Sequence, residues 1–236
     1  VPPIYNFASL EEENWMIAMA NAKRMMRDYV RELKIQGIKS SHIVVEENLW
    51  SAIESILIPK SIDIIIMGTL GAKGIKKFLV GSNASSTLTS VIVPVLFVPL
   101  GASFSRLEKI VITLEAPRDA PGYVEEILIL TKKWALPYEF LHVSTADDED
   151  SVDFNVPHME VLEEMFPDTS FGLSNKFAST FQEGLGVYQK EHPDAMLVML
   201  SSHKNFLEKI FSKSDTEQLV YQPEVPLLVI KEDFIK

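Results

Sequence analysis

Apolar and polar positions follow two different periods along the chain, and these periods predict an alternation of helices and strands. Residues 10–34 repeat apolar side chains at helical spacing, which predicts a long amphipathic helix. Residues 62–67 are apolar at almost every position, which is typical of a strand buried on both faces of a parallel sheet. Strands that alternate with helices indicate an α/β fold with right-handed crossovers.

The same patterns place further elements along the whole chain. Helices are expected at 10–34, 49–58, 82–90, 122–134, 158–165 and 177–191. Strands are expected at 42–46, 62–67, 91–98, 109–114, 138–143, 169–173, 196–200 and 225–230. The acidic stretch 147–153 lacks the ligand spacing of a calcium loop, so it is interpreted as a solvated loop.

One offset relates the two halves of the chain. Met67 and Met199, Pro94 and Pro226, and Ser82 and Ser214 are all 132 positions apart. We interpret this as a tandem duplication with domains at 1–102 and 103–236. Compared with the second domain, the first lacks an opening strand and helix, so about 35 residues are expected to precede Val1, by analogy with 108–142.

Charge and composition narrow the function classes. The chain has 22 basic and 33 acidic residues, a net charge of −11, which argues against general nucleic-acid binding. Residues 1–102 carry 10 basic and 9 acidic residues, and residues 103–236 carry 12 and 24, so the acidity lies in the second half. The absence of Cys excludes disulfides and thiolate nucleophiles. No apolar run is long enough to span a membrane, and no signal peptide is visible, so a cytoplasmic protein is expected.

A glycine motif carries the clearest chemical signal. It runs Met67-Gly68-Thr69-Leu70-Gly71 and then, nine residues later, Gly81-Ser82-Asn83, between a predicted strand and a predicted helix. Glycines allow close backbone approach to phosphates, and a helix N-terminus presents free N–H groups to them. The lysines of the intervening loop, Lys73, Lys76 and Lys77, would add positive potential. A simple turn with a serine N-cap would produce a similar pattern.

This motif, with the flanking strands, resembles that of the universal stress protein family. The resemblance implies two tandem doubly wound parallel five-stranded sheets of the adenine nucleotide alpha hydrolase-like type, which form an intramolecular pseudo-dimer. It also implies an ATP site at Met67, Gly68, Gly71, Gly81, Ser82 and Asn83, with Mg²⁺ carried by the nucleotide. Gly68 and Gly71 would lie against the ribose and phosphates, and Gly81, Ser82 and Asn83 would hold the phosphate chain.

The second half departs from this motif. His203 stands where Gly71 stands in the first half, and Lys213 stands where Gly81 does. Their side chains would prevent close backbone approach, and Asp215 would repel phosphate. Glu115 occupies the position of the family's nucleotide-contacting acidic residue. We therefore expect a degenerate second domain that pairs with the first through strands 91–98 and 225–230.

No catalytic constellation stands out. The five histidines never come at metal-ligand spacing, and no Gly-x-Ser-x-Gly elbow occurs. The sequence therefore favours an ATP-binding sensor or switch of the stress response, with at most slow ATP hydrolysis. A ligand-free interaction scaffold is the alternative, and a true phosphohydrolase is a third class. Possible partners are a second copy of the chain and protein partners that the sequence does not specify, with no nucleic acid or membrane expected.

Overall fold

The computed structural model describes residues 12–57, 62–69, 87, 91–113, 120–145, 157–201, 225–231 and 234. The chain divides into two compact units, 1–60 and 61–236, and each is described by itself. The expected helix at 82–90, apart from Thr87, and the acidic loop at 147–153 lie outside the described residues. The division of the sequence into repeats at residue 102 remains a prediction.

The described residues of the first unit form two helices, and both were predicted. They are α1, Glu12–Ile35, and α2, Leu49–Leu57. The first ends in a Schellman motif, because Gly37 has a φ of 79° and the Ile38 N–H donates to the Leu33 carbonyl at 2.9 Å. The left-handed conformation at this position favours glycine, which has no Cβ to clash.

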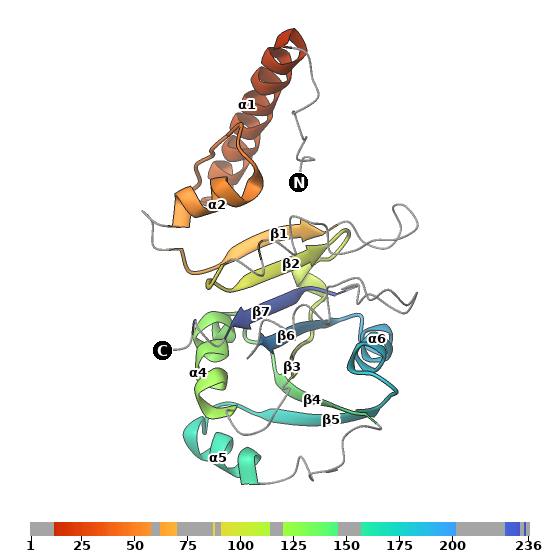
Figure 1. The fold of residues 1–236 in the computed structure, drawn as a ribbon. Coiled ribbons are helices and arrows are strands. Elements are labelled where there is room, and N and C mark those ends of the chain that lie inside the picture. Colours follow the sequence, from red (N-terminus) through yellow and green to blue (C-terminus); the bar gives the residue numbers. More distant parts are fainter. Residues whose placement is uncertain are drawn as a thin grey trace. The chain divides into compact units, whose positions relative to one another are not determined.

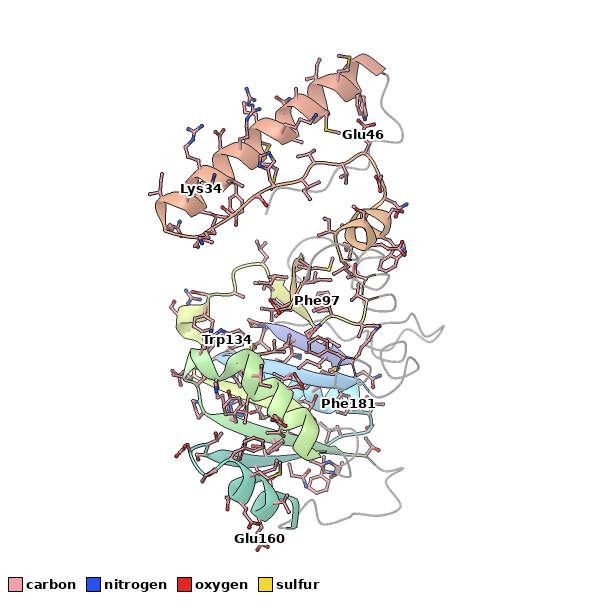
Figure 2. All side chains as sticks on the ribbon, turned by 90° about the vertical axis from the view of Figure 1, so that its left-hand side faces the viewer. Lys34, Glu46, Phe97, Trp134, Glu160 and Phe181 are labelled. Carbon is pink, nitrogen blue, oxygen red and sulfur yellow. The ribbon has the colours of Figure 1, made fainter. Side chains whose placement is uncertain are left out.

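The strand expected at 42–46 is not formed. The Schellman turn sends residues 38–45 back along α1, where they lie in an extended conformation outside any ladder (Figure 2). The Ser40 hydroxyl donates to the Val30 carbonyl of α1 at 3.5 Å. The prediction was wrong because β-branched residues favour an extended backbone, whereas a strand also requires a neighbour with which its backbone groups can pair.

The second unit is built on a seven-stranded sheet in the order β1-β2-β7-β6-β3-β4-β5 (Figure 1). The strands are β1 (Ile65–Thr69), β2 (Val95–Pro99), β3 (Lys109–Thr113), β4 (Tyr138–Ser144), β5 (Phe171–Phe177), β6 (Ala195–Ser201) and β7 (Leu227–Lys231). Five of the six pairings are parallel, and β2 with β7 is antiparallel. The predicted pairing of segments 91–98 and 225–230 is therefore confirmed.

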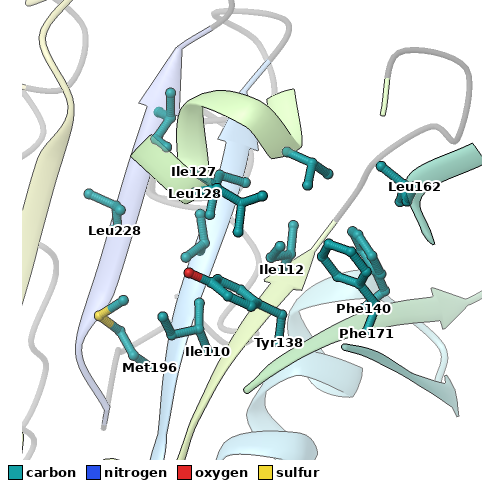
Figure 3. Packing of buried hydrophobic residues seen from close by; sticks show 13 residues of the cluster. Ile110, Ile112, Ile127, Leu128, Tyr138, Phe140, Leu162, Phe171, Met196 and Leu228 are labelled. Atoms are coloured by element: carbon teal, nitrogen blue, oxygen red, sulfur yellow. The ribbon is translucent and has the colours of Figure 1, made fainter. Parts of the chain in front are cut away.

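In the described part of the second unit, three helices and two short 3₁₀ turns accompany the sheet. They are η1 (Phe104–Arg106), α4 (Ala120–Thr131), η3 (Lys132–Trp134), α5 (Pro157–Met165) and α6 (Phe181–Glu191). One face of the sheet packs against α4 and α5, where Ile112, Phe140, Phe171 and Leu162 join a single buried cluster (Figure 3). Because side chains alternate along a strand, Glu139 of β4 points to the other face, where Tyr188 of α6 contacts it.

The α/β class is as predicted, but the strand count is not. Two separate five-stranded sheets were expected, and the described residues form one continuous sheet. The second half supplies five parallel strands, β7, β6, β3, β4 and β5, whereas the first half supplies β1 and β2. The antiparallel β2–β7 ladder joins the two sets, because each presents its last strand as an edge with free backbone groups.

The offset of 132 residues found in the sequence recurs in the geometry. Every register pair of β1 with β2, from Ile65–Val95 to Thr69–Pro99, has its counterpart in β6 with β7 at this offset. The Ile65 N–H donates to the Pro94 carbonyl at 2.9 Å, and the corresponding bond from the Leu197 N–H is 2.8 Å long. The two strand pairs therefore share one register.

The same offset relates two helix N-caps. The Asn48 side chain accepts from the Ser51 N–H of α2 at 3.0 Å. The Thr180 hydroxyl accepts from the Glu183 N–H of α6 at 3.2 Å. Both caps satisfy a backbone donor that the first helical turn leaves free.

Candidate nucleotide site and a polar cluster

Two of the predicted nucleotide-binding residues lie in β1. Met67 is paired with Phe97 of β2, and Gly68 is paired with Val98. The other four predicted residues, Gly71, Gly81, Ser82 and Asn83, lie outside the described residues, as do the loop lysines. The structure therefore places the start of the motif at the carboxyl end of a sheet strand.

The sheet topology determines where this end lies. Because β1 and β2 are parallel, their last residues, Thr69 and Pro99, lie side by side where the two strands end. Because β7 runs antiparallel to β2, the strands of the second half end at the opposite side of the sheet. Ligands of open α/β sheets bind outside the carboxyl ends of the strands, so the two halves offer separate positions.

In the second half, the position of Gly68 is held by Leu200, which is paired with Ile230 in the same register. The other second-half residues that the sequence comparison singled out, His203, Lys213, Asp215 and Glu115, lie outside the described residues. Thus each of the three motif glycines has a counterpart that carries a side chain.

A cluster of four polar side chains was not predicted from the sequence. Lys109 of β3 donates to Glu139 Oε2 of β4 at 2.8 Å. The other oxygen, Oε1, accepts from Tyr188 of α6 at 2.7 Å and from Ser174 of β5. The Lys109 ammonium also lies 5.3 Å from the centre of the Tyr188 ring, within cation–π range. We call these four residues the Glu139 cluster.

Burial and charge act in opposite directions on the Glu139 cluster. Burial raises the pKa of Glu139, but hydrogen bonds from Lys109, Ser174 and Tyr188, with the lysine charge, together lower it below the usual glutamate value. Burial, then the hydrogen bond to the carboxylate, raises the pKa of Tyr188. Both oxygens of Glu139 have partners, so the cluster holds α6 to three strands and leaves no free base.

A sequence signal for the cluster existed. Glu139 is the only acidic residue of the strand Tyr138–Ser144, and Lys109 opens another strand, so each charge needed a partner near the sheet. At the offset of 132 residues, His42 corresponds in sequence to Ser174, and Ile56 corresponds to Tyr188. The first half therefore does not repeat the residues of the cluster.

Neither a metal centre nor a membrane span is found in the described part of the chain. No group of three His, Asp or Glu side chains there is arranged to hold a metal ion. None of the described helices combines the length and the apolarity that a bilayer crossing requires.

The sequence of the first half matches a known protein family. Residues 2–99 match the sequence model of the universal stress protein family. The matched segment ends with β2 and contains the whole glycine motif. No curated protein matches the chain.

Solved structures of universal stress proteins share the fold. A universal stress protein from Archaeoglobus fulgidus is 19% identical, with a TM-score of 0.71 over 95% of this chain and 84% of that one. A putative universal stress protein from Pseudomonas aeruginosa is 13% identical, with a TM-score of 0.60, over 90% and 79%. A functionally unknown protein from Pseudomonas aeruginosa gives 14% and 0.62 over the same shares. The chain is therefore similar to the universal stress protein family over residues 2–99, and it shares the fold of these solved structures.

Proposed function

We propose that this chain is a stress-response protein of two repeats, the first of which binds ATP as a sensor or switch. The observation that carries the proposal is the glycine motif that begins in β1, a strand whose register with β2 is repeated by β6 and β7. The family match over residues 2–99 covers the same motif. Mg²⁺ would arrive with the nucleotide. A cytoplasmic location remains a prediction.

The second repeat is proposed to be a pairing partner without a nucleotide. Leu200, His203 and Lys213 stand at the three glycine positions, and a Cβ at such positions fills the space that a phosphate would use. The antiparallel ladder of β2 with β7 supplies the pairing. Strand edges that are covered in this way are protected from other chains.

A thermal melt with and without Mg-ATP tests the proposal. At about 100 times Kd, binding adds about 2.7 kcal/mol to the free energy of unfolding. For a chain of this size, we expect Tm to rise by roughly 5–10 °C. Gly81→Glu should abolish the rise, because a carboxylate would repel the phosphates. Lys213→Glu, the same charge at the counterpart position, is the matched control and should leave the rise unchanged.

Two other results would favour the alternatives. If the Tm of the wild-type protein and of Lys213→Glu does not change with millimolar ATP, and no nucleotide co-purifies with either, the chain acts as a ligand-free scaffold. If ATP turns over well above background, and a single variant stops turnover while binding survives, the protein is a phosphohydrolase. Slow hydrolysis without such a residue fits a switch.

A further inference from the structure

Strand β5 forms the outer edge of the second half of the sheet. All five strands predicted for this half are formed, and among the described residues β5 has one neighbour, β4, with no strand beyond it. The Ala178 N–H donates to the Ser144 carbonyl of β4, so every second residue counted back from 178 faces β4. Leu173, Asn175 and Phe177 therefore point their backbone N–H and C=O groups outward.

The outward residues include two exposed apolar side chains. Phe177 is 85% exposed and Leu173 is 44% exposed. Because side chains alternate along a strand, both lie on the same face of the sheet as Phe171. On this face α5 contributes Leu162 to the buried cluster that contains Phe171 (Figure 3). The edge therefore extends a buried apolar surface into solvent, and such an edge favours pairing with a further strand.

The protection that edge strands usually carry is missing from β5. Natural edges are commonly protected by a charged side chain, a proline or a bulge. The strand Phe171–Phe177 contains no proline, and its register with β4 is continuous. Its one charged residue, Lys176, is bound to Glu191 of α6 on the face opposite Leu173. Within the described strand, no unpaired charge opposes an approaching strand.

The spacing of the β5 side chains is self-complementary. Leu173 and Phe177 are equidistant from Asn175 along the strand. If a second copy runs antiparallel with a twofold axis at Asn175, Leu173 of each copy lies opposite Phe177 of the other. The same register places Lys176 opposite Ser174, so like charges do not meet. A shift of two residues in either direction would place Leu173 or Phe177 opposite the polar Asn175.

We infer that the outer edge of β5 is the docking site for a second copy of this chain, with the two β5 strands antiparallel about a twofold axis at Asn175. The dimer would join two sheets into one through backbone hydrogen bonds and the apolar contacts of Leu173 with Phe177. The contact needs no nucleotide, so it stands or falls independently of ATP binding. Because one strand edge is a small interface, we expect a weak dimer that forms as the protein concentration rises.

Sedimentation velocity over about two decades of protein concentration tests the association. We expect the wild-type chain to pass from monomer to dimer. Leu173→Lys and Phe177→Lys should each raise the dissociation constant at least about tenfold, because pairing would desolvate the lysine charge against an apolar side chain. Val187→Lys is the matched control, because Val187 is also 44% exposed but lies on α6. It should dimerise as the wild type does.

Cysteine cross-linking tests the register. The chain has no Cys, so an introduced thiol meets another thiol only in a second copy. Opposite residues that exchange backbone hydrogen bonds have Cα atoms about 5.5 Å apart, within the range of a disulfide. With diamide as the oxidant, Asn175→Cys should therefore form a covalent dimer by itself. Leu173→Cys and Phe177→Cys should each stay mainly monomeric alone and form a covalent dimer when they are mixed.

Three results would overturn the inference. The first is a monomer at every concentration, which would leave the edge to a strand of another protein. The second is a dimer that Leu173→Lys does not weaken, or that Val187→Lys weakens equally, because such a dimer would form through another surface. The third is a mixture of the Leu173→Cys and Phe177→Cys proteins that cross-links no more than either alone. The lysine variants should keep the wild-type Tm, since the substituted side chains are exposed, which separates loss of the dimer from unfolding.

Discussion

Leu96 of β2 lies directly opposite Leu228 of β7, and the two residues are themselves separated by the repeat offset of 132. In the flanking pairs, Val95 lies opposite Val229 and Phe97 lies opposite Leu227. The same offset relates Val95 to Leu227 and Phe97 to Val229, so one pair is converted into the other. A local twofold axis therefore passes between Leu96 and Leu228. The offset of 132 residues and the antiparallel ladder express one pseudosymmetry, in which strands related by the offset meet at residues related by the offset.

The environments of these two leucines are unequal. Leu228 is fully buried in the core cluster beneath α4, whereas Leu96 is half-buried beside it. We expect Leu228→Ala to lower the free energy of unfolding by about 3 kcal/mol and Leu96→Ala by about 1.5 kcal/mol, because the cavity is larger where packing is complete. Urea denaturation of the two variants measures the difference. Equal losses would mean that both positions are covered to the same extent.

A second prediction concerns the contact of α6 with β4. A Cβ built on Gly184 would meet Val143 Cγ1 at 2.4 Å, whereas a Cβ on Gly186 meets nothing within 4 Å. Gly184→Ala should therefore destabilise the protein by about 1–3 kcal/mol, since helix and strand must move apart. Gly186→Ala is the matched control and should stabilise by about 0.5–1 kcal/mol, because alanine favours the helix. Thermal melts would distinguish the two, and a harmless Gly184→Ala would contradict the close contact.

The sequence predicted most elements because their patterns are local. Helix α1 was expected at 10–34 and runs from Glu12 to Ile35, and β3 was expected at 109–114 and spans Lys109–Thr113. The strand at 42–46 failed because pairing depends on a distant neighbour, which no local pattern reports. Helix α6 begins at Phe181 rather than 177, since Thr180 supplies the cap and β5 continues through Phe177.

The sequence located the glycine motif but did not reveal the Glu139 cluster. Glycine spacing locates a motif, and the structure places Met67 and Gly68 at the end of β1, as expected from the apolar run before them. The Glu139 cluster was missed because its four residues come from β3, β4, β5 and α6, separated by up to 79 positions (188 minus 109). Only the fold brings them together.

The third prediction concerns the charge of Glu139. Its carboxylate is largely buried and binds the Lys109 ammonium, the Ser174 hydroxyl and the Tyr188 hydroxyl. Glu139→Gln keeps the shape but removes the charge, leaving the partly buried Lys109 without a counterion. We expect the free energy of unfolding at pH 7 to fall by about 2–3 kcal/mol. Urea denaturation measures this, with Glu191→Gln as the control, since the Lys176–Glu191 ion pair is exposed and should contribute little.

The pH dependence of that loss tests its cause. The folded-state pKa of Glu139 is lowered, so its contribution is fully present above the unfolded pKa of about 4.3 and decreases as the pH falls toward the folded value. The stability difference between wild type and Glu139→Gln should therefore be constant from pH 7 to about 5.5 and shrink below about 4.3. A difference that stays constant down to the acid transition would show that the substitution acts through packing. A difference that shrinks would show that the ionised form of Glu139, paired with Lys109, stabilises the fold.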